Sequence, residues 1–165
     1  MKKLRSRHTR SDFQFARVRL GGEEFGIDLK RIKEIAMRFE LRGVAGAAPF
    51  VEGVVTLRGL DVPVIDLRKR FFLNGSFEPG RMLIAQLNGH VAGLLVDEIK
   101  DIKSGCREVM IRPGSAQNRW NGCVEAVVEC AEKSIYIIDL DRVFTEREIK
   151  AIYGPTSGNG DGEAW

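Results

Sequence analysis

Three aspartates stand at the ends of apolar runs and are the side chains best placed for acid–base chemistry. Asp66 ends VPVID, Asp97 ends AGLLVD and Asp139 ends SIYIID. Two such carboxylates on facing strands could serve as a general acid and a general base. A carboxylate at a strand end also commonly accepts hydrogen bonds from the backbone of the following turn. We expect this local, structural role for all three aspartates.

The other reactive side chains form no catalytic or metal-binding pattern. His90 follows an Asn-Gly pair at the tip of an expected hairpin, where we expect it to face solvent. The three cysteines lack CxxC spacing, so we expect reduced and mostly buried thiols at Cys106, Cys123 and Cys130. No glycine-rich phosphate loop is present either. The sequence therefore predicts no catalytic residue, no metal site, no cofactor and no enzymatic activity.

Arg58 has the least ordinary position, in the stretch GVVTLRGLDVPVIDLRKRF. Strand alternation places Arg58 on one face with Val54 and Thr56, and Gly59 after it can take a positive φ. Pro63 cannot donate a ladder hydrogen bond, which predicts an edge or a bulge. An oriented arginine beside an exposed edge suits protein docking better than catalysis. The alternative is a surface ion pair with a local acid, which would contribute little to stability.

Short strands separated by glycine turns must position these residues. Residues 13–29 read as a hairpin around a Gly-Gly pair, and residues 30–41 fit either a helix or a turn and a strand. Further strands are expected in residues 54–58, 62–67, 81–87, 90–99 and 133–140. Residues 145–154 predict a final helix with Thr145 as N-cap and Glu148 at the capping-box position. This pattern predicts an all-β barrel or sandwich.

The order of elements occurs twice along the chain. Residues 20–35 align with 87–102, so that Gly26 matches Gly93, and residues 64–71 align with 137–144, so that Asp66 matches Asp139. The repeat predicts two similar small β-barrels packed side by side. Each would be marginal alone, so we expect a shared apolar interface and a binding groove between them.

Charge and composition limit the possible partners. The chain has 165 residues and a net charge of +3, yet residues 1–10 hold five of the 26 Lys and Arg and no acid. We predict a flexible basic arm over residues 1–12, a domain over 13–152 and a disordered tail over 153–165. The slightly acidic domain disfavours nucleic-acid binding, although a small-barrel nucleic-acid binder with a basic arm stays an alternative. No apolar run is long enough to span a membrane, so we expect a cytoplasmic protein without membrane insertion.

Four segments together resemble the CheW family of chemotaxis coupling proteins, over about residues 13–152. They are FGIDLKRIKEI, GVVTLRGLDVPVIDLR, GLLVDEIKDI and YIIDLDRVF. The resemblance implies two five-stranded β-barrels around a shared core, with short helical turns and a C-terminal helix. It also implies a non-enzymatic adaptor between the cytoplasmic tips of methyl-accepting chemoreceptors and the regulatory domain of the histidine kinase CheA. Such an adaptor works at the chemoreceptor array; related proteins serve twitching or developmental systems.

By position, the resemblance implies an interaction surface for receptor and kinase. The residues that match its motifs are Ile32, Glu34, Ile35, Gly53, Arg58 and Gly59. We expect Glu34 to pair with Arg58 across neighbouring strands. The sequence departs from the family pattern at Thr56, where asparagine is usual, and at Asp61, where an apolar residue is common. The connection over residues 39–50 is also unusual in composition.

Overall fold

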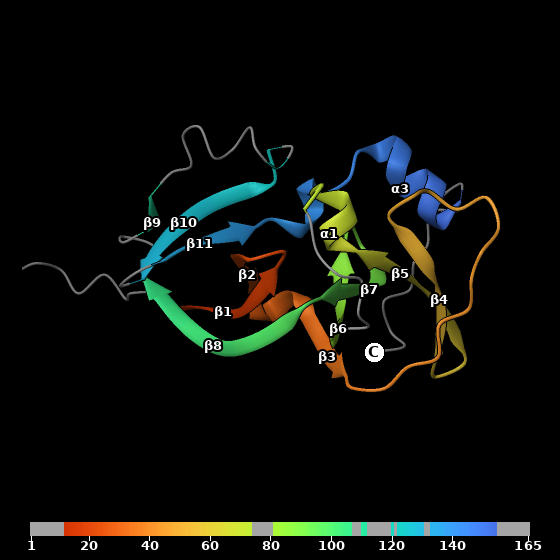
Figure 1. Cartoon of the computed structure of the whole chain (residues 1–165), viewed down its shortest axis with the longest axis horizontal. Helices are drawn as coiled ribbons and strands as arrows, with labels where there is room; N and C mark the ends of the chain where they lie inside the picture. The colour runs from red at the N-terminus through yellow and green to blue at the C-terminus, as the bar shows by residue number, and fades with distance from the viewer. Residues whose placement is uncertain are drawn as a thin grey trace, which may run out of the picture.

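The computed structural model describes residues 12–73, 81–106, 110–111, 120, 122–130 and 133–154. These residues form two mixed, mostly antiparallel sheets that pack beside each other (Figure 1). The first sheet has the strand order β8-β1-β2-β11-β10-β9, and the second has the order β3-β6-β7-β5-β4. The predicted all-β fold of two packed units is confirmed. The sheets stay open rather than closing into barrels, and the two-residue strand β9 adds a sixth strand to the first.

The strands are short, as the spacing of the glycine turns predicted. In the first sheet they are β1 (Asp12–Leu20), β2 (Glu23–Asp28), β8 (Glu98–Cys106), β9 (Met110–Ile111), β10 (Val124–Cys130) and β11 (Lys133–Ile138). In the second they are β3 (Ile32–Ala36), β4 (Val51–Leu57), β5 (Leu60–Asp66), β6 (Arg81–Leu87) and β7 (His90–Val96).

The repeat is visible in the topology, but the two halves of the chain exchange strands. The first-half hairpin β1–β2 pairs with β8 and β11 from the second half. The second-half hairpin β6–β7 pairs with β3 and β5 from the first half. The order β8-β1-β2-β11-β10 therefore matches β3-β6-β7-β5-β4 strand for strand. Each unit contains strands of both halves, so neither repeat forms a unit by itself.

The two matched glycines occupy the same place in each sheet, where parallel strands meet. Gly26 lies opposite Ile137, and Gly93 lies opposite Val64. A Cβ at Gly26 would lie 2.4 Å from Ile137 Cδ1, and one at Gly93 would lie 2.6 Å from Met82 Sδ. Such distances are too short for any real Cβ, so a neighbouring side chain occupies the space above each glycine.

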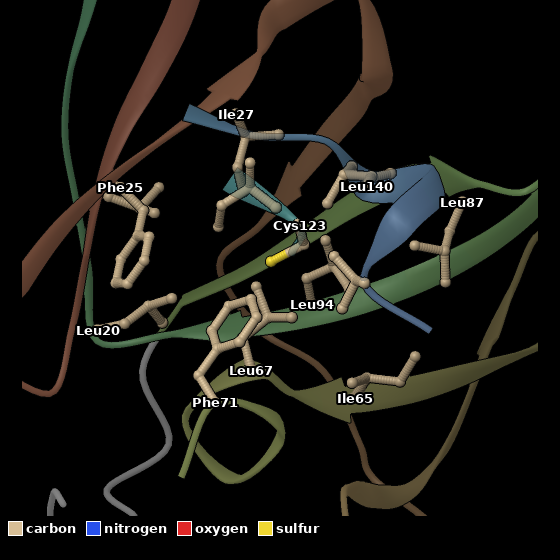
Figure 2. Packing of buried hydrophobic residues seen from close by; sticks show 14 of the residues in the cluster. Leu20, Phe25, Ile27, Ile65, Leu67, Phe71, Leu87, Leu94, Cys123 and Leu140 are labelled. Carbon is tan, nitrogen blue, oxygen red and sulfur yellow. The ribbon is translucent and has the colours of Figure 1, made fainter. Parts of the chain in front are cut away.

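One core joins the two sheets. Side chains of both sheets meet in the largest buried cluster, together with residues from the turns between them (Figure 2). Members labelled in Figure 2 include Leu20, Phe25, Ile27, Ile65, Leu87, Leu94, Cys123 and Leu140. Burial of each large apolar side chain stabilises the fold by about 1.5–3 kcal/mol. The expected shared apolar interface is therefore the main core of the molecule.

Short helical turns follow the strands that end in aspartate. Asp66 caps α1 (Leu67–Arg70) by accepting a hydrogen bond from Arg68 N, and Asp139 caps η3 (Leu140–Arg142) in the same way. Residues 30–41 form a turn and a strand rather than a helix, since η1 (Leu29–Arg31) leads directly into β3. The final helix α3 (Glu146–Tyr153) has the predicted capping box of Thr145 and Glu148.

The ends of the domain differ slightly from the prediction. Strand β1 already begins at Asp12, and α3 continues through Tyr153, so neither residue belongs to an arm or a tail. The Tyr153 ring stacks on His90 at 4.1 Å between centroids, and its hydroxyl donates to Val91 O at 3.0 Å. His90 is therefore half-buried against α3 instead of facing solvent. Residues 1–11 and 155–165 lie outside the described residues, and the arm and the rest of the tail stay predictions.

Candidate functional site

An ion pair between Glu34 and Arg58 lies at the surface of the second sheet. Arg58 Nη2 lies 2.8 Å from Glu34 Oε2, and the two side chains are 59% and 34% exposed. The pair is therefore within reach of a docking partner while each charge is held by the other. Pairing of these two residues was predicted, and the structure confirms it.

The two residues do not come from neighbouring strands, contrary to the prediction. Glu34 is on β3 and Arg58 follows β4, and these strands form the opposite edges of the five-stranded sheet. The ion pair therefore spans the opening between the two edges of the sheet. The alternation of apolar and polar residues along a strand cannot reveal such a contact. The contact depends on how the whole five-stranded sheet curves.

Arg58 occupies the turn of the β4–β5 hairpin rather than the end of a strand. Arg58 has a φ of 49° and Gly59 a φ of 76°, as in the two-residue turns that suit the twist of a hairpin. A left-handed conformation costs a residue other than glycine roughly 1–2 kcal/mol. The arginine thus occupies a position that glycine or asparagine would fill at lower cost.

The predicted residues of β3 lie on both faces of that strand. A register irregularity between Ile32 and Glu34 places Ile32 opposite Ala85 and Ile35 opposite Leu83, while Glu34 faces Ile84. Cross-strand partners share a face of the sheet. Ile32 packs against the main core and Ile35 is 46% exposed on the same side, whereas Glu34 turns to the other side. The structure therefore joins Glu34 with Arg58 and separates both from Ile35.

Gly53 is buried and has a structural role. Its φ is 154°, and a Cβ there would lie 2.1 Å from the carbonyl oxygen of Arg42. The backbones of Arg42 and Val54 exchange two hydrogen bonds of 2.8 and 2.9 Å. Gly53 thus allows the 37–50 connection to approach the outer edge of β4 and cover part of it. The prediction grouped Gly53 with the interaction surface, but the structure places it beneath that surface.

Sequence reasoning missed one polar cluster on the β4–β5 hairpin, formed by Arg42, Thr56 and Asp61. Arg42 Nη2 donates to Asp61 Oδ1 at 2.7 Å and to Thr56 Oγ1 at 3.0 Å, and Thr56 Oγ1 donates to the same carboxylate oxygen at 2.9 Å. We call these residues the polar triad. Thr56 and Asp61 were noted as departures from the family pattern, which was the available signal for the triad.

A hollow of about 460 Å³ lies beside the polar triad. Part of the 38–42 segment forms one wall, and residues 55–57 of β4 form the other. Leu41, within the 38–42 segment, and Met37, next to it, have exposed side chains. The hollow and the polar triad together give the β4 edge of the second sheet both apolar and charged groups.

The candidate acid–base residues are engaged in structural contacts. The buried guanidinium of Arg68 lies between Asp66 and Asp97, with N–O distances of 2.9 and 2.6 Å. Asp97 also accepts a hydrogen bond from Gly21 N at 2.7 Å. Burial raises the pKa of the Cys123 thiol to about 11, so this cysteine is protonated and unreactive near neutral pH. Within the described residues, no group of three His, Cys, Asp or Glu could hold a metal ion.

The matched sequences identify the family. A family model for the CheW-like domain matches residues 14–148. The chain belongs to the CheW-like domain family. Among the relatives named chemotaxis protein CheW, three are similar to this chain over most of its length. In Klebsiella aerogenes the identity is 29% over 84% of this chain and 86% of the relative. In Treponema pallidum it is 26% over 85% and 86%, and in Bacillus subtilis 30% over 75% and 81%.

A solved CheW structure has the same fold. The crystal structure of the scaffolding protein TtCheW from Thermoanaerobacter tengcongensis superposes with a TM-score of 0.75 and 27% sequence identity. The match covers 83% of this chain and 95% of that one. The fold of two packed sheets is thus shared with a CheW scaffold protein. None of the helices in the described part of the chain is long and apolar enough to cross a membrane.

Proposed function

We propose that the protein is a non-enzymatic adaptor that couples methyl-accepting chemoreceptors to a CheA-type histidine kinase. The observation that carries this proposal is the Glu34–Arg58 pair, displayed at the open side of the second sheet in a chain of the CheW-like family. The receptor tip and the regulatory domain of the kinase are the two partners. The protein would act at the cytoplasmic side of a chemoreceptor array.

Energetics supports a binding role for the pair. An exposed ion pair adds only about 0–1 kcal/mol to folding stability. The positive φ of Arg58 costs roughly 1–2 kcal/mol, which an ion pair of this kind at most offsets. Strained residues of this kind concentrate at functional sites, where the conformation presents a side chain to a partner. Arg58 offers a planar fork of donors that Glu34 holds in one orientation.

Coupling by such an adaptor requires no chemistry, only two surfaces on one rigid body. The shared core makes both sheets a single packed unit, so a partner bound to one sheet is held at a fixed position relative to the other. Individual contacts can be weak if many adaptors bind in one array, because multivalency raises the overall affinity. Chemotaxis is the function that the relatives' names favour; a twitching or developmental system would use the same surfaces.

Titration calorimetry with two purified partners tests the proposal. The probes are the regulatory domain of a CheA-type kinase and a soluble receptor fragment containing the cytoplasmic tip, both encoded in the same genome. We expect dissociation constants in the micromolar range for each, and simultaneous binding of both. Absence of binding to every such kinase and receptor of that genome would contradict the adaptor function while leaving the fold unchanged.

A further inference from the structure

The hollow beside β4 begins where the covering connection leaves the outer edge of that strand. Val54 exchanges two backbone hydrogen bonds with Arg42, at 2.8 and 2.9 Å. Peptide groups two residues apart in a strand point to the same edge, so those of Thr56 also point outward. Among the described residues, none of the connection bonds to the backbone of Thr56, and the hollow of about 460 Å³ opens at this level. The outer edge of β4 is thus covered at Val54 and open at Thr56.

The lining of the hollow combines an apolar wall with guanidinium groups. Phe39 and Leu57 are half-buried in the lining and pack against the core of the second sheet. Arg38 and Arg42 are exposed there, beside one acid of the lining, Glu40. Arg42 uses only Nη2 within the polar triad, so its other nitrogens can donate to further acceptors. An aromatic group beside carboxylates fits such a lining, because a guanidinium binds carboxylates and also stacks on aromatic rings.

The described chain ends close to this hollow. The Tyr153 hydroxyl at the end of α3 donates to Val91 O, and Figure 1 shows α3 near β4. By the register of β7 with β5 and of β5 with β4, Val91, Val62 and Val55 lie in one row. Two strand spacings separate Val91 from Val55 of the lining, which is about 10 Å. The eleven residues 155–165 can span up to roughly 36 Å, so they reach the hollow.

The composition of residues 155–165 matches the lining. The segment reads PTSGNGDGEAW, with two acids, one aromatic residue and no Lys or Arg. In an extended backbone Asp161, Glu163 and Trp165 share one face, because side chains alternate with a period of two. The glycines between them leave the backbone free to approach a strand edge closely. One face of the segment would thus present two carboxylates and an indole.

We infer that residues 155–165 bind in this hollow, with their backbone along the open edge of β4 at Thr56. The indole of Trp165 packs on the apolar wall, and the carboxylates meet the two arginines. The bound segment covers a strand edge that would otherwise be available for pairing with other chains. This inference does not depend on the proposed adaptor function, and it replaces the expectation of a disordered tail.

Fluorescence of Trp165 tests the inference in the full chain. The difference between the wild type and Trp165→Phe isolates its emission, since buried Trp120 is present in both. The reference probe is a synthetic peptide of residues 155–165. We expect acrylamide to quench Trp165 about threefold less in the protein than in the peptide, because a bound indole is shielded. The tail variant Asp161→Asn with Glu163→Gln, which changes no described residue, should bring quenching close to the peptide value.

A variant of the hollow and a matched control locate the binding site. Arg38→Glu with Arg42→Gln should also bring quenching close to the peptide value. Lys30→Glu with Arg19→Gln makes the same change in charge at exposed residues outside the hollow and should keep the wild-type shielding. Peptide-like quenching in the wild type would overturn the inference, as would shielding that survives the hollow variant. Shielding that grows with protein concentration would assign the segment to a second copy of the chain and overturn it too.

Discussion

Arg58 and Gly53 both have a positive φ, but the two residues lie in different surroundings. Arg58 takes a left-handed conformation at the surface, where it forms an exposed ion pair with Glu34. Gly53 takes an unusual φ in the interior, and there the gain is structural, because the 37–50 connection lies against the backbone at that point. The two residues sit in the same hairpin and were predicted to share a role. Burial separates them, since only Arg58 can touch a partner.

Replacement of Gly53 by alanine should destabilise the protein by about 2–4 kcal/mol, because its Cβ would collide with a backbone oxygen at a φ unfavourable for alanine. Thermal unfolding followed by circular dichroism measures the effect. Gly43→Ala is the matched control, since no atom lies within 4 Å of a Cβ at that position. Equal melting temperatures for the two variants would contradict the structural role of Gly53.

In the first sheet, charged side chains on neighbouring strands form ion pairs with one another. Glu24 on β2 is 2% exposed, and its carboxylate lies 2.9 Å from Lys100 Nζ of β8 and 3.3 Å from Arg17 Nη1 of β1. Arg17 also donates two hydrogen bonds to Asp101 of β8. The neighbouring ammonium of Lys100 lowers the pKa of Glu24. The charges of Arg17 and Lys133 lower it further, while burial acts in the opposite direction. The cluster joins three adjacent strands through one ionised carboxylate.

This lowered pKa makes the contribution of Glu24 depend on pH. A carboxylate with a lower pKa in the folded state stabilises the fold above its unfolded pKa, and the stabilisation is lost as pH falls through the folded value. We expect Glu24→Gln to lower the melting temperature at pH 7 by roughly 2–5 °C and to have a smaller effect near pH 3. The difference between wild type and variant, measured by calorimetry at both pH values, decides this. A difference that stays constant with pH would show that the charge of Glu24 is unimportant.

The whole molecule behaves as one unit because its halves exchange strands. Each sheet depends on hairpins of one half and on single strands of the other, and the largest buried cluster draws on both sheets. Arg70 of α1 adds a further link, since its guanidinium donates to Val143 O and contacts Glu148 of α3. Neither half can bury its apolar surface alone.

Unfolding should therefore be a single cooperative transition. Differential scanning calorimetry is expected to show one peak whose calorimetric and van't Hoff enthalpies agree, as for a two-state domain of this size. Two separate transitions would mean that the sheets are independent domains, and the rigid coupling between partner surfaces would then lack a basis.

Local patterns predicted the elements of this fold well and their long-range contacts poorly. The glycine turns, the capping box of α3 and the aspartate caps after β5 and β11 all follow from neighbouring residues. The repeat revealed two similar units, but alternation carries no information on which strands exchange between them. The Glu34–Arg58 pair was predicted from family resemblance, and the polar triad was missed because Arg42 reaches it from a connection without periodic pattern.

The variant Arg58→Asn separates a binding role of Arg58 from a contribution of Arg58 to stability. Asparagine keeps the left-handed turn at lower cost and removes the charge that pairs with Glu34. Calorimetric titration with the receptor tip, beside a thermal melt of the same sample, gives both quantities. We predict an unchanged or higher melting temperature and at least tenfold weaker binding. Unchanged binding, or a loss of stability as large as the loss of binding, would contradict the account.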